Sequence, residues 1–183
     1  SPTTKPSCIT EDGTLFRIIN TIIQNKECYI KTKNAHDKED QDSRDPKSSA
    51  WQIMCEDYNS SNESLDQLSP IGQRAMVGYC ISSDICKQYD KLSYGEFQEC
   101  VLYLNAQYRI VRNAEKASGN HAHIGTYIGG KIYILYFDEC LKETGEKALY
   151  CCAYPELEDG LWHCSGEPFT PRARSCHRSA GNS

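Results

Sequence analysis

The sequence of 183 residues lacks any long apolar run. Its longest, Ile132 to Phe137, is far shorter than the roughly 18 residues that a membrane-spanning helix requires. A charged-then-apolar leader is also absent from its start, so we expect that any signal peptide has already been removed. Positive charge is not in excess, since 20 Lys and Arg stand against 25 Asp and Glu. These features predict a protein that binds neither a membrane nor nucleic acid.

Signatures of catalysis and of cofactor binding are missing too. No two cysteines have the C-x-x-C spacing that zinc ribbons and thioredoxin-like sites use. Because no pattern identifies a nucleophile, a cofactor or a metal, we expect a protein that is not an enzyme and carries no cofactor. Apolar residues make up only 39% of the chain, which is lean for a large core. Disulfide bonds and the 12 Tyr would have to supplement that core.

Cysteine, in contrast, is abundant. The chain has 11 cysteines at wide and irregular spacings, which is typical of a disulfide framework formed in an oxidising compartment. We therefore expect a secreted, extracellular protein. Because 11 is an odd number, at least one cysteine must stay outside the bridges. The cysteines expected to form structural disulfides, one of them unpaired, are Cys8, Cys28, Cys55, Cys80, Cys86, Cys100, Cys140, Cys151, Cys152, Cys164 and Cys176.

Two Asn-X-Ser sequences agree with secretion. Asn59 and Asn62 are formal acceptors for N-linked glycans, and both lie in a polar stretch where a glycan could be accommodated. The sequence does not decide whether either asparagine is glycosylated.

One helix is clearly predicted, over about residues 11–26. Thr10 can cap it, and its apolar residues recur every three or four positions. A helix of this length is roughly 24 Å long, whereas a disulfide needs its two Cα atoms within about 7 Å. Cys8 and Cys28, which flank the helix, are therefore expected to join its ends to other elements and not to each other. The apolar stripe consists of Leu15, Ile18, Ile19, Ile22 and Ile23.

Beyond residue 50 the sequence predicts short, aromatic or β-branched strands separated by Ser, Asn, Asp and Gly. Gly129-Gly130 predicts a tight hairpin turn at 126–134. We therefore expect an α+β fold that is mostly β, with domains at 1–104 and 105–183. In the first, a helix packs on a small disulfide-linked sheet; the second is an antiparallel β-sandwich or barrel-like half. The other strands are expected at 51–55, 75–81, 97–104 (continuing to 112), 148–154 and 160–164.

The histidines suggest two alternatives to a simple binding protein, a metal site and a hydrolase. His121 and His123 could share one face of a strand and hold a metal with Glu139 or His163. We prefer to interpret them as two polar residues at a loop, and predict no metal site. A small secreted ribonuclease-like hydrolase would need His, carboxylate and Arg groups, yet the spacing of the histidines does not specify one, so we predict no catalytic residues. The residues that could supply such a set are His121, His123, Glu139, Arg109 and Arg112.

A polar and charged run from Asn34 to Ala50 predicts a long exposed loop. Asp40, Asp42 and Asp45 resemble part of a calcium-binding loop, but its central Gly and closing Glu are missing. The loop could instead protrude into a protease, which makes an inhibitor of extracellular host proteases a third functional hypothesis.

Aromatic residues are dense in the second half of the chain. On alternating strands half of them would point into the core, and the others could form a surface for a partner protein. The aromatic residues that would be divided in this way between core and surface are Tyr127, Tyr133, Tyr136, Tyr150, Tyr154 and Trp162.

The layout of the chain resembles the dual-domain secreted effectors of the fungus Fusarium oxysporum, the FOLD effectors. The resemblance lies in the helix stripe Leu15 to Ile23 and in the order of the first six cysteines, Cys8, Cys28, Cys55, Cys80, Cys86 and Cys100. It implies a helix on a disulfide-linked sheet, followed by a β-sandwich. It also implies a non-catalytic virulence protein that binds host proteins and can be detected by host immune receptors. We expect such a protein to be a monomer.

Overall fold

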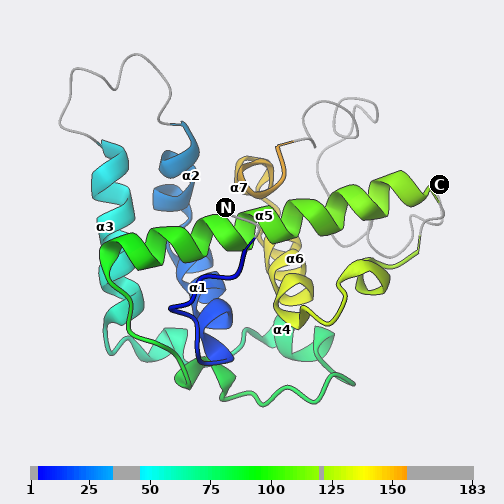
Figure 1. Ribbon diagram of the computed structural model, residues 1–183, viewed down its shortest axis with the longest axis horizontal. Helices are drawn as coiled ribbons and strands as arrows, with labels where there is room; N and C mark the ends of the chain where they lie inside the picture. Colours follow the sequence, from blue (N-terminus) through cyan, green and yellow to red (C-terminus); the bar gives the residue numbers. More distant parts are fainter. Residues whose placement is uncertain (1–3, 35–45, 120–121, 156–183) are drawn as a thin grey trace.

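The computed structural model describes residues 4–34, 46–119 and 122–155, and their regular structure is helical (Figure 1). The longest helix, α5, runs across the others. Short 3₁₀ turns, η2 to η4, connect several of the helices. The α-helices are α1 (Gly13–Gln24), α2 (Lys26–Asn34), α3 (Pro46–Asn59), α4 (Pro70–Ala75), α5 (Tyr94–Ser118), α6 (Ile132–Thr144) and α7 (Lys147–Ala153). The 3₁₀ turns are η2 (Glu63–Leu65), η3 (Ile85–Lys87) and η4 (Ile124–Tyr127).

The expected α+β, mostly β fold is wrong, because the described residues contain no β-strand. The strand expected at 97–112 lies within α5, which begins with a capping box between Ser93 and Glu96. Segment 51–55 lies in α3, and 148–153 of the segment expected at 148–154 lie in α7. In the segment expected at 75–81, Ala75 ends α4 and the other residues form turns and a loop. Burial on a helical period therefore outweighed the strand preference of aromatic and β-branched residues.

The expected hairpin at 126–134 is replaced by a turn into α6. Gly129 and Gly130 do have the positive φ angles that the Gly-Gly pair predicts, 59° and 86°. They connect η4 to α6, however, and do not join two strands. The β-sandwich expected for 105–183 is accordingly absent from the described part of that range, while the strand expected at 160–164 lies outside the described residues. The boundary expected between residues 104 and 105 falls within α5.

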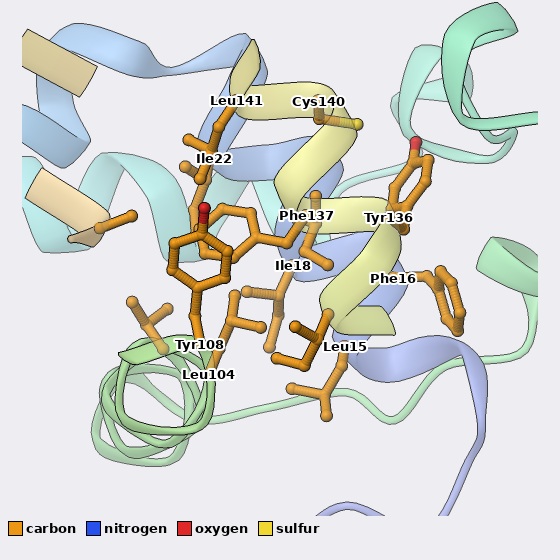
Figure 2. Packing of buried hydrophobic residues seen from close by; sticks show 14 of the residues in the cluster. Leu15, Phe16, Ile18, Ile22, Leu104, Tyr108, Tyr136, Phe137, Cys140 and Leu141 are labelled. Carbon is orange, nitrogen blue, oxygen red and sulfur yellow. The ribbon is translucent and has the colours of Figure 1, made fainter. Parts of the chain in front are cut away.

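The helix predicted for residues 11–26 is confirmed as α1. Nearly all its side chains are buried, because α1 packs against α2, α3, α5 and α6. Figure 2 shows Leu15, Phe16, Ile18 and Ile22 of α1 facing side chains of α5 and α6. α1 is thus the centre of one helical core, and its first turn lies beside the loop that contains η3.

Gly13 allows this loop to approach α1 closely. A Cβ atom at Gly13 would lie 1.9 Å from the carbonyl oxygen of Ile85 and 2.4 Å from that of Gln88. We predict that Gly13→Ala lowers the free energy of unfolding by about 1–3 kcal/mol, since backbone atoms would have to move. Gly95→Ala, in the first turn of α5 with open space around it, is the matched control and should be neutral or stabilising by up to about 1 kcal/mol. Urea denaturation measures both, and equal effects would contradict the close approach.

Candidate functional site

The residues considered for a metal site or a ribonuclease have structural roles or lie outside the described residues. His123 caps η4, because its Nδ1 accepts a hydrogen bond from the backbone N–H of Gly125 at 2.9 Å. Glu139 is buried on α6. His121 and His163 lie outside the described residues. Within those residues, no group of three or more His, Cys, Asp or Glu side chains is arranged to hold a metal ion.

Arg112 belongs to a buried network of charges and tyrosines. Its NH1 group lies 2.9 Å from the hydroxyl of Tyr108 and 3.3 Å from Oδ1 of Asp138, and its guanidinium also contacts the ring of Tyr154. Lys142 lies 2.9 Å from the other carboxylate oxygen of Asp138. These groups bind one another away from the surface, so the network joins α5 to α6 and to the end of α7. Arg109, another residue of the expected ribonuclease set, lies on α5 at an exposed position.

The expected disulfide framework is not found in the structure: no disulfide links two cysteines within the described residues. Most of these cysteines are buried in the helical core as small apolar side chains, while Cys80 is exposed. Cys8 faces Cys100 of α5, with the two sulfur atoms 3.6 Å apart, and does not face Cys28. Cys164 and Cys176 lie outside the described residues.

Both glycan acceptors are part of the hydrogen-bonded structure. The side-chain amide of Asn59 donates to the carbonyl of Leu92 at 2.8 Å and accepts from its N–H at 3.2 Å. The amide nitrogen of Asn62 donates to Asp57 at 3.0 Å. A glycan would replace one of the two hydrogens on either nitrogen, so it would have to be accommodated beside these hydrogen bonds.

The loop expected at 34–50 is wrong at both of its described ends. Asn34 ends α2, and residues 46–50 begin α3, where Ala50 is buried. Residues 35–45, which include Asp40, Asp42 and Asp45, lie outside the described residues. The hypotheses of a calcium site and of an inhibitory loop therefore stay predictions.

One cavity of the structure is a groove of about 360 Å³. It lies between the N-terminal segment (residues 4–12), the start of α1, the loop before η3, the middle of α5 and the start of α6. A volume of this size is typical of a site for a small ligand or for a few residues of a partner. The residues that line this groove are Lys5, Ile9, Thr10, Glu11, Asp12, Leu15, Phe16, Ile81, Ile85, Tyr103, Gly130, Lys131, Ile132 and Tyr133.

One wall of the groove is fixed by contacts between α5 and the start of α6. Tyr103 and Tyr133 form a hydrogen bond, and burial raises the pKa of Tyr133. One helical turn further along α5, Gln107 accepts a hydrogen bond from the ammonium group of Lys131. These two pairs hold Lys131 and Tyr133 at the wall, so this part of the groove is formed before any ligand binds.

The wall that the N-terminal segment forms is fixed by Asp90, which lies outside the lining. Its carboxylate accepts hydrogen bonds from the backbone N–H groups of Thr10 and Glu11, at 2.8 and 2.9 Å, and from the hydroxyl of Thr14 at 2.7 Å. Burial alone would raise the pKa of Asp90, but the hydrogen bonds from Thr10, Thr14 and Glu11 outweigh it and lower the pKa to about 2. Asp90 is therefore ionised throughout the neutral range and holds the end of the N-terminal segment against α1.

The lining combines an apolar floor with a charged rim. Six aliphatic or aromatic side chains form the floor. Lys5 and Lys131 bring positive charge to the rim, while Glu11 and Asp12 bring negative charge. This combination suits a ligand with an apolar centre and polar groups of both signs. The floor residues are Ile9, Leu15, Phe16, Ile81, Ile85 and Ile132.

A second cavity, of about 310 Å³, lies beside α4 and α6. Its polar side chains already bind one another: the hydroxyl of Tyr136 donates to Asn20 at 2.6 Å and accepts from the backbone N–H of Ser69 at 2.9 Å. Fewer groups are thus available for a ligand there, and the groove is the stronger candidate.

Of the aromatic residues expected to be divided between the core and a partner surface, Tyr133 lines the groove. Tyr136, Tyr150 and Tyr154 are buried, and Trp162 lies outside the described residues. The aliphatic floor was missed, because isolated Ile residues in a sequence carry no signal of a shared cavity.

None of the described helices is both long and apolar enough to cross a membrane. A comparison of the chain with protein-family models gives no match, and neither do comparisons with curated proteins and with solved structures.

Proposed function

We propose that this chain is a non-catalytic binding module that holds a short extended segment of a partner protein in the groove. The observation that carries the proposal is the combination of an apolar floor with a rim of both charges. A peptide with one large apolar side chain between an acidic and a basic residue would bury that side chain on Ile85 and Ile132. Its charges would then face Lys5 or Lys131 and Glu11 or Asp12.

A peptide suits this lining better than a fatty acid of similar volume. The carboxylate of a fatty acid could use Lys131, but Glu11 and Asp12 would be left without a cationic partner from the ligand. That the partner is a host protein, that the protein is secreted, and that immune receptors detect it stay predictions from cysteine content and from the resemblance. The ribonuclease and protease-inhibitor hypotheses gain no support from a described contact.

The proposal is tested with the capped tripeptide Ac-Glu-Leu-Lys-NH₂, titrated by isothermal calorimetry or NMR. Ac-Glu-Ser-Lys-NH₂ is the matched control ligand, and dodecanoate is the competing class. Burying a leucine side chain is worth about 1.5–3 kcal/mol, so the leucine peptide should bind roughly tenfold or more tightly than the serine peptide.

Ile132→Glu should abolish this preference. Ile132 opens α6, where an acidic residue is favourable for the helix, so the variant is expected to fold. Ile53→Glu, on an exposed position of α3, is the matched control and should bind like the parent. Saturable binding of dodecanoate but not of the leucine peptide, or unchanged binding by a folded Ile132→Glu variant, would overturn the proposal.

A further inference from the structure

Cys8 and Cys100 come together from positions 92 residues apart. Cys8 lies on the N-terminal segment and is partly exposed, whereas Cys100 is buried on α5. Their sulfur atoms are 3.6 Å apart, and a disulfide requires about 2.05 Å. A relative shift of about 1.6 Å would therefore bring the sulfurs to bonding distance.

This shift can come from the N-terminal segment. Cys8 lies in a turn outside any helix, closed by a hydrogen bond from the N–H of Ile9 to the carbonyl of Pro6 at 3.2 Å. Cys100, in contrast, lies within a helix of 25 residues. The hydrogen bonds of Asp90 to Thr10 and Glu11 hold the segment two residues further on, so Cys8 stays beside Cys100.

We propose that Cys8 and Cys100 are an oxidisable pair, which a small disulfide such as oxidised glutathione converts into one reversible bond between the N-terminal segment and α5. The Cys8 thiolate attacks one glutathione sulfur, giving a mixed disulfide and releasing one glutathione thiolate. The Cys100 thiolate then attacks the Cys8 sulfur and releases the second glutathione. Both protein thiols lose their protons to solvent, and one oxidised glutathione becomes two reduced molecules.

Two properties of the pair favour this order of attack. Cys8 is the more exposed of the two, so glutathione can reach it first. Burial raises the pKa of both thiols above the ordinary value, and the neighbouring Cys8 raises that of Cys100 further. Oxidation should therefore accelerate roughly tenfold per pH unit below the thiol pKa, because only the thiolate attacks.

The bond would also affect the groove. Ile9, next to Cys8, and Tyr103, one turn after Cys100, line it. Oxidation should thus fix two of its walls relative to each other and tighten peptide binding. This consequence rests on the proposed function, whereas the bond itself does not.

The full chain is incubated in glutathione buffers of increasing oxidised fraction and then digested without reduction. We expect a peptide pair that joins Cys8 to Cys100 and a rise in Tm of about 10 °C, because the bond closes a loop of more than 90 residues. Cys8→Ser and Cys100→Ser should each remove this rise. Cys80→Ser, which removes an exposed thiol, is the matched control and should keep it.

The results of this experiment separate formation of the Cys8–Cys100 bond from its effect on the groove. Absence of the 8–100 linkage at full oxidation, or Cys8 linked mainly to another cysteine, would overturn the inference. If the linkage forms and raises Tm but leaves the affinity for Ac-Glu-Leu-Lys-NH₂ unchanged, the pair stands and its effect on the groove is refuted. If no peptide binds in either state while the linkage forms, the proposed function alone fails.

Discussion

Asp138→Ala is expected to lower the free energy of unfolding by about 3–5 kcal/mol, the largest effect of any substitution considered for this protein. The side chain of Asp138 is fully buried on α6, and its carboxylate accepts a hydrogen bond of 2.6 Å from Tyr108. Arg112 and Lys142, whose side chains are only 11% and 14% exposed, provide the opposing charges. Alanine would leave both cations buried without this carboxylate.

Asp84→Ala is the matched control. Asp84 forms an ion pair with Lys87 at 3.7 Å, and both side chains are more than half exposed. Solvent screens such pairs, so this substitution should change the free energy of unfolding by less than about 0.5 kcal/mol. Urea denaturation of both variants at pH 7 makes the comparison, and similar small effects would show that Asp138 is not the centre of a buried network.

Low pH should lower the free energy of unfolding of the wild-type protein, because it protonates the carboxylate of Asp138. Burial alone would raise the pKa of Asp138, but Lys142, Arg112 and Tyr108 outweigh burial and lower it. A carboxyl with a lowered folded pKa contributes stability that is complete above the unfolded value of about 3.9 and is lost as pH falls towards the folded value. The Asp138→Ala variant should therefore lose less stability than the parent when the pH falls from 5 to 3.

Arg17→Met is the second substitution with a large expected effect, a loss of about 2–4 kcal/mol. Arg17 is fully buried on α1 and donates to the carbonyl oxygens of Tyr58 and Ser60, at 2.8 and 2.9 Å. It also pairs with Asp66 at 2.7 Å and lies 4.0 Å from the ring centre of Tyr89. Methionine fills similar space but leaves two carbonyl oxygens without these donors.

Arg74→Met is the matched control, because it shows how much stability is lost when an exposed arginine is replaced by methionine. Arg74 is exposed near the end of α4. Replacing it should cost less than about 0.5 kcal/mol. If Arg17→Met unfolds at the same urea concentration as Arg74→Met, the hydrogen bonds of Arg17 do not hold α1 to the end of α3.

The sequence predicts α1 well and α5 poorly, for a physical reason. In α1 the apolar stripe of Ile residues lies among polar residues, so its period is evident. In α5 the buried positions also recur at helical spacing, at Phe97, Cys100, Leu104 and Tyr108. Aromatic residues favour strands only where they pack well on a sheet. The capping sequence Ser93-x-x-Glu96 was therefore a better indication of a helix start than the aromatic residues were of a strand.

The groove could not be predicted from the sequence. Its lining comes from several segments far apart in the chain, and their proximity depends on how α1, α5 and α6 pack. The pairing of Cys8 with Cys100 has the same origin. Helix length argued against Cys28 as the partner of Cys8, but the sequence holds no signal for Cys100, which lies near Cys8 only because the N-terminal segment packs on α5.

A ¹H–¹⁵N NMR titration of the full chain with Ac-Glu-Leu-Lys-NH₂ tests most directly whether the groove binds a peptide. We expect the largest chemical-shift changes on the N-terminal segment, the loop leading into η3 and the start of α6, at residues 5–12, 81–85 and 130–133. Largest shifts at the exposed apolar residues Ile53, Leu102 and Ile110, on the outer faces of α3 and α5, would contradict it. They would place the binding surface outside the groove.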